Sequence, residues 1–202
     1  SRGLFHKAVA MSVYVLPDAT AEKAGEVAAA VANAVGLDGG KASLKSLLRV
    51  PAKRFATIDD KAAALGPTPI IGDAMTPQSI AETFRKGEEA RIPLIIGNTS
   101  DDGSVIAAFG VDPAAMVEQL GAAGVGLKLL YPNMSEEERA RQALRDIVFT
   151  MNPRWVADNH SKRASTWRYY YDYVAENDRT ALPNGAPHGY EVAFMLDTLD
   201  YL

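Results

Sequence analysis

Two short stretches of the 202-residue chain carry the residue types that acid–base catalysis needs. SDDGS, at residues 100–104, holds Asp101 and Asp102, and GAPHGYE, at residues 185–191, holds His188. An imidazole can take a proton near neutral pH, and a carboxylate beside it fixes the ring tautomer and stabilises the imidazolium that forms. Both stretches are also ordinary turn sequences, because Asp, Gly and Pro favour turns. Spacing alone therefore leaves two interpretations open: a base with its orienting acid, or two unrelated turns.

A general base of this kind acts on a nucleophile, and an acid that precedes a histidine is the order of Ser…Asp/Glu…His triads. No G-x-S-x-G motif, the usual setting of such a serine, occurs in the chain. Under the first interpretation, the chain would therefore hold the acid and the base of a triad but not its nucleophile. For the other histidines we expect structural or surface roles: His6 as a hydrogen-bonded residue beside a strand, and His160, in ADNHSKR, on a solvated helix face.

Each candidate loop follows a predicted strand. Apolar or alternating runs predict strands at residues 7–13, 92–96 and 167–173. The middle run is continuously apolar, which is typical of a parallel strand buried on both faces. Long helical segments separate the strands, so the sequence predicts an α/β protein with a parallel sheet. In such a sheet, functional residues gather at the carboxyl ends of the strands, where both loops would lie.

Helix caps and apolar spacing mark the segments between the strands. Thr20 and Gly36 predict the ends of the first helix, and Thr76 as N-cap with Pro77 after it predicts another, which ends at Gly87. Further helices are expected at residues 43–49, after Pro51, from Asp112-Pro113, from Ser135 with Glu138 in a capping box, from Asn152-Pro153 to about residue 164, and over the last residues from 190.

The bulk properties limit the classes of function. A net charge of −4 with mixed signs argues against a nucleic-acid partner, and no stretch approaches the roughly 18–20 consecutive apolar residues of a membrane span. With no cysteine, disulfides and thiolate metal sites are excluded. The 48% hydrophobic content suits one domain, and the compartment stays open. The abrupt start, SRGLFHKAVAMSVYVL, suggests a piece of a larger protein.

Four segments, taken in order, resemble the C-terminal portion of type-B carboxylesterases, the group that includes cholinesterases and bacterial para-nitrobenzyl esterases. They cover nearly the whole chain: RGLFHKAVAMS, RIPLIIGNTSDDGS, YPNMSEEERARQALRDIVFTMNPRWVADNHS, and WRYYYDYV with GAPHGYEVAFML. The resemblance implies that residues 1–202 are the C-terminal part of a single α/β-hydrolase domain. They would hold the last strands of its central sheet and the helical excursions between them.

The resemblance also implies roles for individual residues. His188 falls on the catalytic base, and Asp102, the residue before the glycine, falls on the acid, with Asp101 as the alternative. Ser12 matches a serine that supports the acid, and Glu191 matches an acid that we interpret as structural. The nucleophilic serine and the oxyanion-hole glycines would lie N-terminal to RGLFHKA, and Ser1 is not the nucleophile.

The function implied by this resemblance is that of a serine carboxylesterase acting on a small-molecule ester. It would need no cofactor and no metal, and the partner of this chain would be the missing N-terminal part of the same protein. Alone, the chain is expected to be inactive, with an exposed sheet edge that lowers its stability. Three alternatives stay open: a catalytically silent binding or adhesion relative, an amidase or carbamate hydrolase, and a stand-alone α/β domain without a triad.

Overall fold

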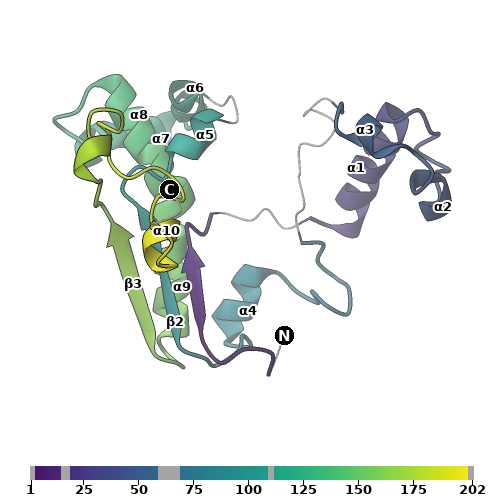
Figure 1. Cartoon of the computed structure of the whole chain (residues 1–202), viewed down its shortest axis with the longest axis horizontal. Coiled ribbons are helices and arrows are strands. Elements are labelled where there is room, and N and C mark those ends of the chain that lie inside the picture. The colour runs from purple at the N-terminus through teal and green to yellow at the C-terminus, as the bar shows by residue number, and fades with distance from the viewer. Residues whose placement is uncertain (1–2, 15–18, 59–68, 109–111, 200–202) are drawn as a thin grey trace. The chain divides into compact units, whose positions relative to one another are not determined.

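Three parallel strands form the sheet that carries both candidate loops (Figure 1). They are β1 (Ala8–Met11), β2 (Leu94–Thr99) and β3 (Thr166–Tyr171), and β2 lies between the other two. In the register of the sheet, Ile96 is paired with Ala10 on one side and with Arg168 on the other. The predicted parallel sheet is therefore confirmed, with β1 and β3 shorter than expected. The acid and the histidine follow adjacent strands, β2 and β3, at the same edge of the sheet.

The computed structural model describes residues 3–14, 19–58, 69–108 and 112–199. These residues divide into two units, of which one comprises Ser1–Val15 with Phe84–Leu202 and contains the sheet. The other, Leu16–Thr83, is a small helical unit with α1 (Ala21–Ala34), α2 (Leu44–Leu47) and α3 (Ala52–Phe55). The expected end signals of α1 are confirmed: Thr20 caps its start, and Gly36 follows its end with φ +89°.

One face of the sheet is packed against the helix α9 (Met151–His160) (Figure 1). Leu94 and Ile96 of β2 form a buried core with Val156 and Ala157 of α9, and partly buried side chains from β1 and from α4 (Ile80–Lys86) pack around it. The opposite face carries a row of paired residues that stay exposed, namely Val9, Ile95 and Trp167 at 48%, 37% and 56%. The expectation that β2 is buried on both faces is thus wrong for Ile95 in this chain.

A helical excursion connects β2 to β3, and its first part follows the predicted caps. It contains α5 (Ser104–Ala108), α6 (Pro113–Gln119), α7 (Ala122–Leu130) and α8 (Glu136–Arg145). Asp112 caps α6, with Pro113 as its first residue, and Ser135 accepts the Glu138 N–H at the start of α8. These helices arrange α8 so that its later residues face the loop that follows β2.

The expected helix start at Asn152-Pro153 is wrong, because α8 continues into α9 through a π-helical turn, η1 (Asp146–Thr150). The Met151 N–H bonds the Asp146 carbonyl in this wider turn, and the Asn152 side chain donates to the Val148 carbonyl. Pro153, which has no N–H to give, is therefore tolerated in the first turn of α9. The helix also ends earlier than expected, at His160.

Two other predicted helices are shorter than the sequence suggested. α4 (Ile80–Lys86) begins after Ser79, whose hydroxyl accepts the Glu82 N–H, so Thr76 is not its N-cap. Thr76 instead donates its N–H to Asp73 in a preceding turn. After β3 come a 3₁₀ turn, η2 (Glu176–Asp178), and α10, which spans only Val192–Met195. The predicted continuation of the last helix partly lies outside the described residues.

Candidate active site

The acid loop, residues 98–104, leaves the carboxyl end of β2 and turns directly into α5. Its turn is closed by local hydrogen bonds: the Thr99 N–H donates to Asp102 Oδ2 at 3.0 Å, and the Ser104 N–H donates to the Asp101 carbonyl at 2.9 Å. Asp102 has no exposed surface. A buried carboxylate is stable only when its oxygens find donors, and this loop supplies one of them from its own backbone.

The histidine loop, residues 182–189, follows β3 and η2 and approaches the acid loop closely. Gly185 has φ +118°, and a Cβ added there would lie 2.4 Å from Ser100 Oγ. Ala186, the next residue, is fully buried. Only glycine combines this backbone conformation with this close approach, so Gly185 allows the histidine loop to reach the acid loop.

Besides the contact of His188 with Asp102, three hydrogen bonds join the acid loop and the histidine loop, which are far apart in the sequence. The Asp101 N–H donates to the Ala186 carbonyl, and the Ala186 N–H donates to Ser100 Oγ, both at 2.8 Å. The His188 N–H donates to Ser104 Oγ at 3.1 Å. The backbone on each side of Asp102 is therefore tied to the backbone that carries His188, which fixes where the two side chains meet.

His188 and Asp102 form the central contact of the site. His188 Nδ1 lies 2.6 Å from Asp102 Oδ1, and the Asp102 side chain is 0% exposed while the ring is 37% exposed. A carboxylate only accepts, so Nδ1–H is the donor and the neutral ring carries its lone pair on Nε2. This hydrogen bond raises the pKa of His188 above its ordinary value of 6.5, against the lowering effect of partial burial. The pair thus has the tautomer and the basicity that a general base requires.

Asp101 makes a different contact, although it lies next to Asp102. Its Oδ1 pairs with Arg141 of α8 at 2.6 Å, and both side chains are largely buried. Burial raises the pKa of the Asp101 carboxyl, and the hydrogen bond from Arg141 opposes that effect. Asp101 and Asp102, the two candidates for the acid, therefore have different partners: Asp101 pairs with Arg141, and Asp102 is the carboxylate beside His188.

A second buried carboxylate, Glu191, lies near the histidine and has 0% exposed surface. Tyr169 donates its hydroxyl to Glu191 Oε1 at 3.0 Å, and the Ser12 hydroxyl is a longer donor to the same oxygen at 3.5 Å. Ser12 thus contacts Glu191, while Asp102 accepts hydrogen bonds from the Thr99 N–H and from His188. The backbone of Ser12 has an unusual φ of +53°. The charge of Glu191 contributes to the raised pKa of His188, after Asp102 and against burial.

Sequence patterns assign no role to the residues that support the His188–Asp102 pair. Tyr169 was visible only as one of several aromatic residues in a strand, and Ser100 and Ser104 only as turn formers. Arg141 and Arg145 lie four residues apart on α8 and face the acid loop, where Arg145 donates to the Ser100 carbonyl at 2.9 Å. An i, i+4 pair of arginines is the one signal that the sequence offered, and it does not name the partner.

The prediction that His160 lies on a solvated helix face is wrong. The ring is 2% exposed, with Nδ1 3.0 Å from Glu89 Oε1 and Nε2 2.8 Å from the Ile92 carbonyl. Pro153, Val156, Ala157 and His160 form the buried stripe of α9, a helical spacing that was available in the sequence. His6 is exposed before β1, so the expected structural role for it is also wrong.

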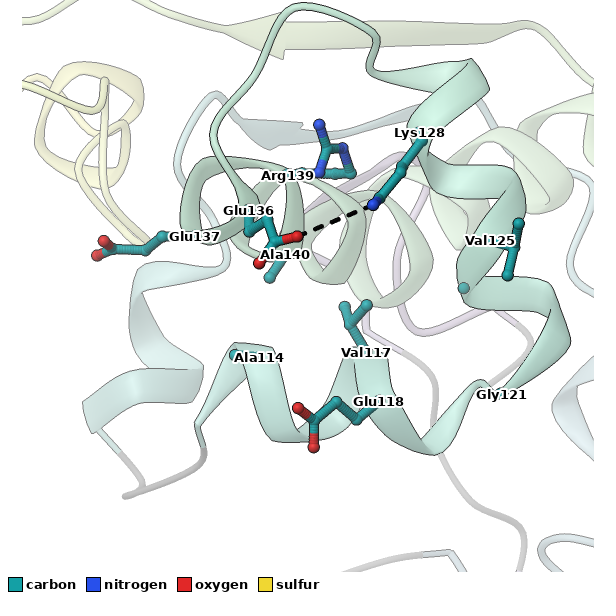
Figure 2. Close-up of a pocket in the computed structure, with 11 residues that line it drawn as sticks. Ala114, Val117, Glu118, Gly121, Val125, Lys128, Glu136, Glu137, Arg139 and Ala140 are labelled. Atoms are coloured by element: carbon teal, nitrogen blue, oxygen red, sulfur yellow. Dashed lines mark ion pairs between the residues drawn. The ribbon is translucent and has the colours of Figure 1, made fainter.

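A hollow of about 440 Å³ lies between α6, α7 and α8 (Figure 2). Val117, Val125 and Ala140 contribute apolar walls, and Lys128 faces Glu136 across a 3.9 Å ion pair. Neither His188 nor Asp102 lines this hollow. It is therefore separate from the chemistry described above.

Two further properties concern only the described part of the chain. No three histidine, aspartate or glutamate side chains converge there in the manner of metal ligands. Within the same residues, no helix combines the length and the apolar character needed to cross a membrane.

Comparisons with known proteins relate the chain to one family of hydrolases. A sequence model of the carboxylesterase family matches residues 1–124, and no curated protein matches the chain in sequence. Two solved structures of PNB esterase superpose with TM-scores of 0.72 and 0.70, at 25% and 24% identity, and cover 98% and 100% of this chain. A carboxylesterase of Geobacillus stearothermophilus superposes with a TM-score of 0.70 at 20% identity over 98% of the chain.

These structures are all much longer than the chain. The superpositions cover 43%, 45% and 43% of the three solved chains, so the 202 residues span less than half the length of their structural relatives. Within that span the expected α/β-hydrolase fold is confirmed, including the parallel sheet and the helical excursions.

Proposed function

Because the chain belongs to the carboxylesterase family, we propose that it supplies the acid and the base of a serine ester hydrolase, with the serine outside these 202 residues. The contact of His188 Nδ1 with Asp102 Oδ1 at 2.6 Å carries this proposal. It joins a fully buried carboxylate to a partly exposed imidazole, and it leaves Nε2 as the basic nitrogen. The opposite arrangement, with Nε2 on the acid, would leave Nδ1 for proton transfer instead.

In the proposed reaction, the serine hydroxyl attacks the carbonyl carbon of an ester while His188 Nε2 takes its proton. The resulting imidazolium is stabilised by the Asp102 carboxylate, which stays ionised. When the tetrahedral intermediate collapses, the same proton passes from Nε2 to the leaving alkoxide, and an alcohol departs. A water molecule then attacks the acyl-enzyme with His188 again as base, which releases the carboxylic acid and restores the serine.

The residues behind the pair have supporting roles in this proposal. Glu191 adds a second negative charge near the imidazolium that forms during each step, and Tyr169 and Ser12 hold that carboxylate by hydrogen bonds. Burial and the charge of Glu191 raise the pKa of Tyr169, so its hydroxyl stays protonated and remains a donor. Ser12 and Glu191 thus act on His188 through position and charge and do not touch the substrate.

A comparison of two forms of the protein tests the proposal. The 202-residue chain alone should not hydrolyse a small p-nitrophenyl ester, whereas the intact protein that contains it should hydrolyse the ester with a burst of p-nitrophenol from acylation. Robust hydrolysis by the isolated chain would contradict the assignment of the serine to another segment. An intact protein that binds partners but shows no hydrolysis of esters, amides or carbamates would instead indicate the silent binding relative.

A further inference from the structure

Asp101 lies where the acid loop, the histidine loop and α8 meet. Its N–H bonds the Ala186 carbonyl, its carbonyl accepts the Ser104 N–H, and its carboxylate pairs with Arg141. Each of these contacts is with a different segment. A shift of Asp101 would therefore move the acid loop relative to His188, since Asp102 is the next residue along the chain.

α8 packs against the turn of the acid loop that contains Asp101. Arg145 donates to the Ser100 carbonyl at 2.9 Å, and a Cβ added at Gly103 would lie 3.3 Å from the Cβ of Arg145. Arg145 is itself held by Asp146 at 2.8 Å and by the Tyr170 hydroxyl at 3.1 Å. The helix is thus fixed against the loop at both ends of the turn, and Arg141 makes the shortest of these contacts.

We infer that Arg141 is a positioning residue, which holds the turn of Asp101 so that Asp102 meets His188 at hydrogen-bond distance. The expected effect on catalysis rests on the proposed function, whereas the geometry of the contact between Arg141 and Asp101 does not depend on it. Arg141 acts through Asp101 and the backbone, and it touches neither the imidazole nor the reacting atoms.

Charge supports the same role. Asp101 and Asp102 are adjacent buried carboxylates, and the charge of Asp102 disfavours ionisation of Asp101. Arg141 compensates the charge of Asp101, with a smaller contribution from Arg145. Without Arg141, the buried Asp101 carboxylate would have to take up a proton or turn toward water, because an unpaired buried charge is costly. Either response disturbs the backbone that positions Asp102.

The test uses the intact protein with the variants Arg141→Gln and Asp101→Ala, which remove the same ion pair from opposite sides. Arg139→Gln is the matched control, since Arg139 lies on α8 but donates to the carbonyls of Tyr131 and Met134. The measurements are kcat and KM for a soluble ester, and the titration of His188 by NMR. The charged groups that influence His188 are Asp102 and Glu191, and all the variants leave both in place.

We expect each single variant to lower kcat by about tenfold or more with KM within about threefold, and to lower the pKa of His188 as its contact with Asp102 loosens. The double variant should be no worse than either single variant, because both remove one interaction. Arg139→Gln should leave kcat and the titration of His188 unchanged. Rescue of kcat by Arg141→Lys, relative to Arg141→Gln, would support the role of the charged contact.

An unchanged titration of His188 in a folded Arg141→Gln protein would overturn the inference. If Arg141→Gln does not fold, Asp101→Ala carries the test, because the arginine that it leaves behind is 21% exposed and can turn to water. A protein that hydrolyses no ester would refute the proposed function alone, since the titration of His188 would still report whether Arg141 positions the pair.

Discussion

Replacement of Asp102 by asparagine is the sharpest perturbation of this site. Both oxygens of Asp102 act as acceptors, one for His188 Nδ1–H at 2.6 Å and the other for the Thr99 N–H at 3.0 Å. Asparagine has nearly the same size but only one acceptor oxygen. In either orientation of the amide, one of these two donors would face an NH₂ group.

The catalytic consequence follows from which contact the asparagine keeps. If the amide oxygen keeps the Thr99 N–H, the NH₂ group faces Nδ1, and the ring must move its proton to Nε2, where it blocks base catalysis. If it keeps His188 instead, the buried Thr99 N–H loses its acceptor and the acid loop is strained. Loss of the correct tautomer in a triad costs about 10⁴ in kcat. We expect a loss of about 10³–10⁴ for Asp102→Asn, or about 4–5.5 kcal/mol of activation free energy.

The assay is the initial rate of p-nitrophenyl ester hydrolysis by the intact protein across a range of pH, with thermal unfolding as a check on folding. Asp101→Asn is the matched control, because it makes the same substitution one residue away and still offers Arg141 an acceptor. Its kcat should fall less than in Asp101→Ala, because the amide oxygen still accepts from Arg141, and far less than in Asp102→Asn. An Asp102→Asn enzyme within about tenfold of the wild type, or a larger loss for Asp101→Asn, would refute the assignment of the acid.

Three further predictions follow from the same geometry. Asp102 raises the pKa of His188 above 6.5, and the neutral ring is the active form, so kcat/KM should rise with pH through a midpoint above 6.5. This midpoint should move to lower pH in Asp102→Asn. A midpoint unchanged by the substitution would contradict the effect of Asp102 on the pKa of His188. Glu191→Gln removes a negative charge near the ring and should also lower the pKa of His188, as measured by NMR titration, whereas a raised pKa would count against the role given to Glu191. Gly185→Ala introduces a Cβ 2.4 Å from Ser100 Oγ at a residue whose φ is +118°. In urea denaturation, it should reduce the free energy of unfolding by about 1–3 kcal/mol, with a larger fractional loss of kcat. Full stability would show that the two loops can separate without cost.

Much of the fold could be predicted because local sequence patterns indicate its strands and helix caps. The apolar run before the acid loop and the alternating run before the histidine loop both gave strands, and Thr20, Asp112 and Ser135 cap helices as expected. Errors occurred where tertiary contacts override local signals. Local signals predict a helix start at Asn152-Pro153, but a π-helical turn before Pro153 accommodates the proline inside a longer helix. The polar neighbours of His160 predict a solvated position, but the residue lies on the buried stripe of α9.

The candidate site, too, could be predicted only in part from the sequence. The sequence and its family resemblance pointed to His188 and Asp102, but the order of residues could not separate Asp102 from Asp101. The separation comes from the turn of the acid loop, which directs one carboxylate to His188 and the other to Arg141 of α8. Arg141 lies 40 residues from Asp101 in the chain, and Tyr169 lies 22 residues from Glu191. No local pattern encodes such contacts, because they arise only when the helical excursion folds back on the sheet.

The role of His188 as the base of a serine ester hydrolase can be measured in the pre-steady state. The intact protein and its His188→Ala variant are mixed with a p-nitrophenyl ester in excess, and the burst and the steady-state release of p-nitrophenol are recorded. We expect a burst followed by turnover for the wild type, and for the variant no burst and a rate lower by about 10³ or more. A burst of equal size and rate in His188→Ala would show that His188 is not the base.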